Sequence, residues 1–123
     1  PALLTGFDVL LHASRWEGLP RAVVQALLTG IPAVTFDNDG APEVVFDHET
    51  GILVPLGRTD RLAEGVLELA ADPALRTRLG VAGRRLCLDR FDWRTMVDEL
   101  DVLYRTPTEP PAPDANAPSP LAQ

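Results

Sequence analysis

One short segment carries residues whose types and spacing suit the binding of a phosphorylated ligand. Glu17, Gly18 and Pro20 lie between an apolar run that ends at His12 and a second apolar run that follows Pro20. In open α/β sheets, ligands bind at such strand–loop–helix junctions, beyond the carboxyl ends of the strands. A helix start offers unpaired N–H groups and a partial positive charge, which suit a diphosphate, and Gly18 lets the backbone approach a ligand closely. We therefore expect an anion-binding loop here.

The helix expected after this loop has one narrow polar face. Its polar residues Arg21, Gln25 and Thr29 are spaced four residues apart, so they share one side of a helix. Gln25 lies roughly 7–8 Å along the helix axis from Pro20 at the usual rise per residue. A nucleotide with its diphosphate at the helix start would run its ribose along this face, where Gln25 can bond the ribose hydroxyls.

The same residues also allow a plainer interpretation. Glu17 can simply favour the positive end of the helix dipole, and Arg21, Gln25 and Thr29 can form an ordinary solvent-exposed stripe. A strand, a glycine loop and a helix in succession are common and form a weak signal by themselves. On the physical pattern alone, both interpretations stay open. His12, near the end of the strand, is interpreted as a structural residue rather than a catalytic base.

The sequence around this loop predicts strands that alternate with helices, and these elements must hold the loop in place. Short apolar runs bounded by turn-forming residues predict buried strands at residues 7–12, 33–36 and 51–55. A turn is predicted at residues 37–40, and residues 41–46 are expected to hold one helical turn. The alternation predicts a parallel α/β sheet. Three strands are few for a doubly wound sheet, so we expect the chain to supply part of one.

Four helices are predicted, at residues 20–29, 60–71, 73–89 and 93–104. Pro20 suits the first helical position, where its missing N–H is not needed. The other three helices each follow or begin with an aspartate that is expected to cap them; these are Asp60, Asp72 and Asp92.

Two features of the later helices carry further expectations. Gly80 and Gly83 predict a weak point in the helix at residues 73–89, because glycine is a poor helix former. In the helix at residues 93–104, apolar side chains recur at the spacing of one buried face, so we expect this helix to pack on the core. Those side chains are Met96, Val97, Leu100, Leu103 and Tyr104.

The ends of the chain differ from its middle. Half of the 12 prolines fall within residues 106–123, where almost no large apolar side chain occurs, so we expect a disordered tail there. The chain begins at Pro1, without an initiator methionine, and soon enters an apolar run. We therefore expect it to be a piece of a larger protein.

Composition and charge exclude several classes of function. The formal net charge is −7, and all eleven basic residues are arginine. Such a protein is repelled by nucleic-acid phosphates and by anionic lipid, so we expect no nucleic-acid partner. No apolar run reaches the ~18 residues of a membrane span. The only cysteine, Cys87, cannot form an internal disulfide, so we expect a cytoplasmic protein in which Cys87 is a buried or half-buried thiol.

The loop around Glu17 and Gly18, together with the helix after it, resembles the signature of the family 4 retaining glycosyltransferases, which share the GT-B fold. The family pattern is a strand, then P-S-x-x-E-G-x-P, a second glutamate eight positions after the first, and A-x-x-x-G-x-P-V-V. Residues 12–20 read HASRWEGLP here, and residues 25–34 read QALLTGIPAV. Later blocks also match, at residues 39–45, 50–55, 60–63 and 90–93. The resemblance covers about residues 6 to 105.

The resemblance implies a role for each matched position. Glu17 would contact hydroxyls of the donor sugar near the anomeric centre, as the catalytic residue. Gly18, Leu19 and Pro20 would line the diphosphate loop, with N–H donors from Gly18 and Leu19 only. Gln25 stands where the family has its second glutamate, which binds the ribose. The donor-binding residues implied are Ser14, Gly18, Leu19, Pro20, Arg21 and Gln25.

The chain departs from the family pattern in three ways. Gln25 can still exchange hydrogen bonds with hydroxyls, but it lacks the charge that strengthens such bonds. Ala13 replaces the usual proline. The basic pair that neutralises the leaving diphosphate, and the acceptor-binding amino-terminal domain, both lie upstream in the family, and this chain has no lysine at all. We therefore expect the chain to be inactive alone.

The resemblance implies an α/β fold with a partial Rossmann-like parallel sheet, the carboxy-terminal part of a GT-B fold, at residues 1–105. The implied function is transfer of a sugar from a nucleoside-diphosphate sugar to an acceptor, with neither a metal nor another cofactor. One rival is a non-catalytic remnant that binds nucleotide sugars. Another is a different GT-B enzyme, such as a sugar-nucleotide epimerase or a phosphorylase. An Arg-x4-Lys block and a first Rossmann-like domain upstream would favour the transferase.

Overall fold

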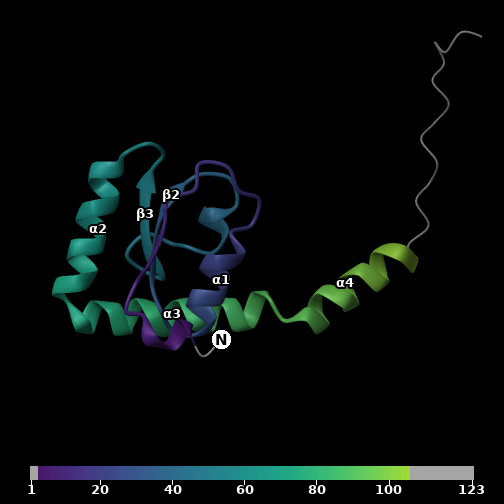
Figure 1. Cartoon of the computed structure of the whole chain (residues 1–123). Helices are drawn as coiled ribbons and strands as arrows, with labels where there is room; N and C mark the ends of the chain where they lie inside the picture. The colour runs from purple at the N-terminus through teal and green to yellow at the C-terminus, as the bar shows by residue number, and fades with distance from the viewer. Residues whose placement is uncertain (1–2, 106–123) are drawn as a thin grey trace, which may run out of the picture. The chain divides into compact units, whose positions relative to one another are not determined.

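The computed structural model describes residues 3–105, and within them three strands form one parallel sheet (Figure 1). These strands are β1 (Leu10–His12), β2 (Ala33–Asp37) and β3 (Gly51–Pro55), in the order β1-β2-β3. Leu10 lies opposite Ala33, and Val34 lies opposite Ile52. The parallel pairing of all three strands confirms the predicted α/β sheet.

The first strand is shorter and more exposed than predicted. Only Leu10–His12 pair with β2, while Leu4–Gly6 form a 3-10 turn, η1. The N–H of Leu10 donates to Pro32 O, and Pro32 has no N–H with which to continue the ladder upstream. The predicted buried strand at residues 7–12 is therefore wrong in its length and its burial: Phe7 is 53% exposed and Leu11 is 51% exposed.

Helices cover both faces of the sheet. Helix α1 (Arg21–Leu28) packs on one face and helix α2 (Thr59–Ala71) on the other. Helix α3 (Pro73–Arg90) crosses the base of both layers, with α2 and α1 on opposite sides of the strands above it (Figure 1). Leu79 of α3 joins the cluster under α2, and Cys87 of α3 joins the cluster under α1.

Each face is filled by alternate residues of the strands, as expected where side chains point to opposite faces in turn. The α2 side buries Val34, Phe36, Ile52, Val54, Leu62, Leu69 and Leu79. The α1 side buries Val23, Leu27, Ala33, Val44, Val45 and Cys87. Cys87 has no exposed surface, which confirms the expected buried thiol, and burial raises its pKa to about 11.

The predicted weak point in α3 is wrong, because the helix is continuous from Pro73 to Arg90. Its glycines serve close packing instead. A Cβ added at Gly80 would lie 2.0 Å from Gly30 O, and one added at Gly83 would lie 2.5 Å from Leu27 Cδ2. Gly30 has a φ of 83° and ends α1 with N–H donation to Leu27 O, as is common after a helix. The glycines of α3 therefore let the helix lie directly against the end of α1.

Two of the predicted helix starts differ in detail. Pro20 is the N-cap of α1 rather than its first residue, and its carbonyl accepts from the N–H of Val23 and of Val24. Helix α2 begins at Thr59 with Arg58 as N-cap, so Asp60 does not cap it. The Arg58 guanidinium holds the Asp60 carboxylate instead, with Nε 2.9 Å from Oδ1.

The predicted cap at Asp72 is confirmed, because Asp72 Oδ1 accepts from the N–H of Leu75 at 2.9 Å at the start of α3. The single helical turn expected at residues 41–46 is a 3-10 turn, η2 (Ala41–Glu43).

Helix α4 (Trp93–Arg105) forms a unit of its own. None of its residues is buried within that unit, and the expectation that its apolar face packs on the core stays a prediction. Helical spacing specifies that the helix has an apolar face, but it does not specify what that face meets. The tail predicted at residues 106–123 lies outside the described residues. Within residues 3–105, no helix has both the length and the apolarity needed to cross a bilayer.

Candidate functional site

The candidate site lies where β1 and β2 end. The loop of residues 13–20 connects the end of β1, at His12, to the start of α1. The turn of residues 38–40 follows the end of β2, at Asp37. The carboxyl ends of parallel strands meet at one edge of a sheet, which is where α/β proteins bind ligands. The predicted ligand loop therefore has the turn after β2 as its structural neighbour.

Glu17 is held at two points in this loop. Its backbone N–H donates to Oδ2 of Asp39 at 2.8 Å. Its carboxylate Oε1 lies 3.3 Å from Nε2 of His12, and the Glu17 side chain is 36% exposed. A carboxylate placed in this way is fixed in direction and still reachable by a ligand.

His12 links Glu17 to the interior of the sheet. Nδ1 of His12 is 3.4 Å from Oγ1 of Thr35, which lies opposite His12 in the β1–β2 register. Thr35 has no exposed surface, and the His12 side chain is 15% exposed. The two ring nitrogens of His12 therefore face different partners, one buried and one in the ligand loop. This agrees with the prediction that His12 is structural and adds that it acts on Glu17.

The turn after β2 also contacts the next residue of the loop. The N–H of Gly40 donates to Gly18 O at 3.1 Å. A Cβ added at Gly40 would lie 2.6 Å from Gly18 O, so only glycine fits there. A Cβ added at Gly18 would instead meet nothing within 4 Å. The outer side of Gly18 is therefore open, as its predicted role beside a ligand requires.

The start of α1 leaves several hydrogen-bond donors free. Pro20 is buried and has no N–H. The backbone N–H groups of Val23 and Val24 both donate to Pro20 O. Four other N–H groups of this junction donate to no acceptor within the described residues; they belong to Gly18, Leu19, Arg21 and Ala22. These donors lie at the positive end of the helix dipole, so the junction can accept an anion.

The remaining predicted residues that we place here are Ser14, Arg21 and Gln25. The Ser14 hydroxyl donates to Trp16 O at 3.2 Å, so it shapes the loop. Arg21 and Gln25 are both exposed on α1. Gln25 borders a hollow of about 250 Å³ together with Leu4 and the end of α1. The structure thus brings Glu17 and Gly18 together with the turn after β2, and it leaves Gln25 further along the helix.

Asp39 and Gly40 are the residues of this site that the sequence analysis missed. They were interpreted as part of a turn and as the start of a matching family block at residues 39–45, and neither was given a role at the site. The signal was an Asp-Gly pair directly after a predicted strand, at the sheet edge where a ligand was expected. Nothing in the pattern indicates that Asp39 reaches Glu17, because the two residues are 22 positions apart.

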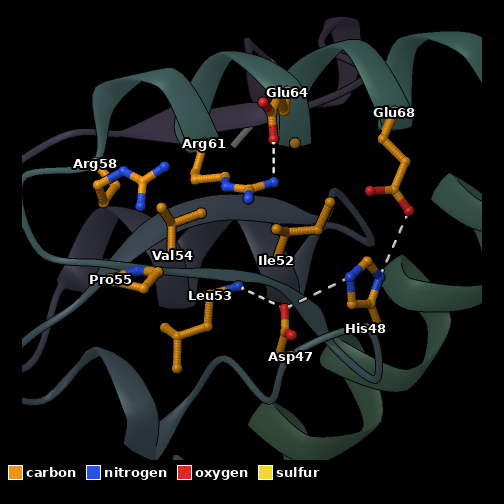
Figure 2. Close-up of a pocket in the computed structure, with 11 residues that line it drawn as sticks. Asp47, His48, Ile52, Leu53, Val54, Pro55, Arg58, Arg61, Glu64 and Glu68 are labelled. Carbon is orange, nitrogen blue, oxygen red and sulfur yellow. Dashed lines mark hydrogen bonds and ion pairs between the residues drawn. The ribbon is translucent and has the colours of Figure 1, made fainter.

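A second hollow, of about 400 Å³, lies between β3 and α2 (Figure 2). Each of its ionic side chains already has an ionic partner. His48 Nδ1 is 3.5 Å from Glu68 Oε1, and Arg61 NH1 is 2.7 Å from Glu64 Oε2. Asp47 Oδ1 accepts from the N–H of Leu53 at 3.0 Å, on the outer edge of β3. The Asp47–Leu53 bond covers part of a strand edge that is otherwise open to wrong pairing, and the ionic groups around it are paired, so we assign this hollow a structural role.

Comparison with known proteins adds an independent finding. Residues 1–86 match the model of the family described as "Glycosyl transferases group 1". The chain is 35% identical over 109 residues to alpha-maltose-1-phosphate synthase of Mycolicibacterium smegmatis, covering 84% of this chain and 28% of that protein. It is 40% identical over 79 residues to a GDP-mannose-dependent alpha-(1-6)-phosphatidylinositol monomannoside mannosyltransferase of the same organism, covering 64% and 21%.

Solved structures give the same result for the fold. Sucrose-phosphate synthase from Thermosynechococcus elongatus superposes with a TM-score of 0.79 at 28% identity, covering 84% of this chain and 26% of that one. Anabaena Alr3699/HepE, solved in complex with UDP-glucose, has a TM-score of 0.79 at 25% identity, covering 83% and 28%. These neighbours are GT-B glycosyltransferases, and the chain spans roughly a quarter of each. From its three-stranded parallel sheet and its match over residues 1–86, the chain belongs to the family of group 1 glycosyl transferases.

Proposed function

We propose that this chain forms the donor-binding part of a retaining glycosyltransferase, which moves a sugar from a nucleoside diphosphate to an acceptor. The observation that carries the proposal is the placement of Glu17. Its carboxylate stands at the ligand edge of the sheet, 3.3 Å from His12, next to a helix start with unused N–H donors. A sugar diphosphate needs both features, because its anion and its reacting carbon are only a few bonds apart.

The chemistry assigned to the site is electrostatic and positional. Negative charge grows on the diphosphate as the sugar leaves, and fixed N–H donors stabilise it without having to reorganise. Gly18 and Leu19 supply those donors in the proposal, with the dipole of α1 behind them. Glu17 binds hydroxyls of the sugar near the carbon that develops positive charge. Gln25 and Arg21 continue the site along α1, with Gln25 assigned to the ribose.

Two comparisons support a nucleotide-sugar donor. A relative is named as a GDP-mannose-dependent mannosyltransferase, and a structural neighbour was solved with UDP-glucose. The chain spans only about a quarter of these proteins, so we expect it to bind a nucleotide and to turn over no sugar when it is purified alone. In this proposal the complete site also takes the basic pair that the family resemblance places upstream of this chain, where it would neutralise the leaving diphosphate.

The test is a comparison of binding and turnover in the full-length protein. Calorimetric titration with UDP and GDP measures the nucleotide site, and release of UDP or GDP from UDP-glucose or GDP-mannose measures the reaction. We expect Glu17→Ala to reduce turnover by about 100-fold, the order expected when a group facing developing charge is removed, while the nucleotide still binds. Binding with no turnover by the wild type would favour a non-catalytic nucleotide-sugar module. No binding of either nucleotide would refute the proposal.

A further inference from the structure

The turn after β2 has an unusual backbone at one residue. Asp39 has a φ of 49°, in the left-handed region that glycine, asparagine and aspartate adopt most readily. Asn38 Nδ2 donates to Asp39 Oδ2 at 3.3 Å, and the N–H of Ala41 donates to Asn38 O at 3.1 Å. The turn is therefore well determined, and its conformation points the Asp39 carboxylate at the ligand loop.

The Asp39 carboxylate makes a contact that a plain turn residue would not need. Its Oδ2 accepts from the N–H of Glu17 at 2.8 Å, which is the length of a charge-assisted bond. One residue along each segment, the N–H of Gly40 donates to Gly18 O at 3.1 Å. The two bonds run in opposite directions and clamp the Glu17–Gly18 stretch to the end of β2.

Direct binding of a diphosphate does not explain this carboxylate. An aspartate beside a phosphate repels it, so Asp39 is a poor ligand for the anion assigned to this loop. Turn geometry does not explain it either, because glycine satisfies a positive φ with no side chain. What remains is the effect on Glu17, whose backbone orientation decides where its carboxylate points.

We propose that Asp39 is a positioning residue: by holding the N–H of Glu17, it sets the direction of the Glu17 carboxylate toward the donor sugar. This inference rests on the proposed function, in which Glu17 contacts that sugar. His12 holds the far end of the same side chain, at 3.3 Å. Asp39, in the turn after β2, and His12, at the end of β1, therefore fix the two ends of one residue.

Two variants separate the carboxylate from the turn. Both Asp39→Gly and Asp39→Asn suit a positive φ, but only asparagine keeps a side-chain oxygen that can accept from Glu17. In the full-length protein we expect Asp39→Gly to lower kcat for UDP-glucose or GDP-mannose by about 10- to 100-fold, as for a small misplacement of a reacting group. Its affinity for UDP or GDP should change by less than about twofold, because the bond is not made to the nucleotide. Asp39→Asn should recover most of the lost kcat.

A double variant shows whether Asp39 acts through Glu17. Adding Asp39→Gly to Glu17→Ala should cause no further loss, since coupled residues are not additive. A residue that only stabilises the fold would lower kcat again by the same factor. Full kcat in Asp39→Gly, or equal losses in both backgrounds, overturns the positioning role while leaving the proposed function standing.

An NMR measurement tests the bond without any substrate. The amide proton of Glu17 should move upfield in Asp39→Gly relative to the wild type, while Asp39→Asn lies between them. An unchanged Glu17 amide overturns the inference. If the bond is seen but neither nucleotide binds the wild-type protein, the proposed function has failed, and the positioning role fails with it.

Discussion

Nε2 of His12 lies 3.3 Å from Oε1 of Glu17, while Nδ1 of the same ring lies 3.4 Å from the hydroxyl of Thr35. One imidazole thus joins an exposed carboxylate to a fully buried hydroxyl. This arrangement makes the orientation of Glu17 depend on a residue that never contacts the donor in the proposed site.

We predict that His12→Ala lowers the turnover of the full-length protein by about tenfold, because Glu17 loses the contact that orients its carboxylate. Binding of UDP or GDP should be unchanged in calorimetry. Thr35→Val is the matched control, since it keeps the volume and removes the hydroxyl. It should lose about 1 kcal/mol of unfolding free energy and only a small part of the turnover. Wild-type turnover in His12→Ala would contradict the role of the ring.

We predict that Gln25→Ala weakens UDP or GDP binding by about 1 kcal/mol, the usual worth of hydrogen bonds between neutral groups. Gln25→Glu should bind as tightly as the wild type or better, because a carboxylate accepts hydroxyl protons more strongly. Calorimetric titration distinguishes the three proteins. If Gln25 is only part of a solvent-exposed stripe, all three affinities will be equal.

We predict that Gly80→Ala destabilises the fold by about 3 kcal/mol, because the added Cβ would lie 2.0 Å from the Gly30 carbonyl and forced overpacking has this order of cost. Equilibrium unfolding in urea measures the loss. Gly18→Ala is the matched control, since its Cβ meets nothing within 4 Å. That variant should fold normally and bind nucleotide less well, because the methyl group occupies the space beside the diphosphate loop. Equal stability of the two variants would contradict the packing described for α3.

We predict that native protein resists alkylation of Cys87 by iodoacetamide at pH 8, and that unfolded protein reacts. The thiolate is the reactive form, and burial raises the pKa of Cys87 to about 11 from an ordinary value of 9.0. A raised pKa in the folded state means that this group stabilises the fold below about pH 9, and that its contribution disappears as the pH rises through about 11. Mass spectrometry after timed labelling checks the first statement, and urea unfolding at pH 8 and 10.5 checks the second.

The strand–loop–helix junction could be predicted from the sequence because each of its signals is local. Apolar runs predict the strands, and the loop between them contains Gly18 and Pro20. The structure places Glu17 and Gly18 at the ligand edge of a parallel sheet, as that pattern requires. All of the site roles stay predictions, since they depend on a donor; this holds for Ser14, Glu17, Gly18, Leu19, Pro20, Arg21 and Gln25.

The elements that were predicted wrongly depend on partners far away in the sequence. The short β1 is limited by Pro32, which directly precedes β2, and Gly80 of α3 lies against the Gly30 carbonyl at the end of α1. Asp39 reaches Glu17 only because two strand ends are adjacent in space. The local sequence pattern does not indicate which residues far apart in the chain will come into contact.

Helix α3 also sets the order in which this chain can fold during synthesis. Leu79 completes the cluster on one face of the sheet and Cys87 completes the cluster on the other. Neither cluster can close until the ribosome has released the segment from Pro73 to Arg90, although all three strands have left it by Pro55. During that interval the nascent strands expose apolar faces on both sides, and such surfaces aggregate readily. Both faces of the nascent sheet therefore stay incompletely covered until α3 emerges.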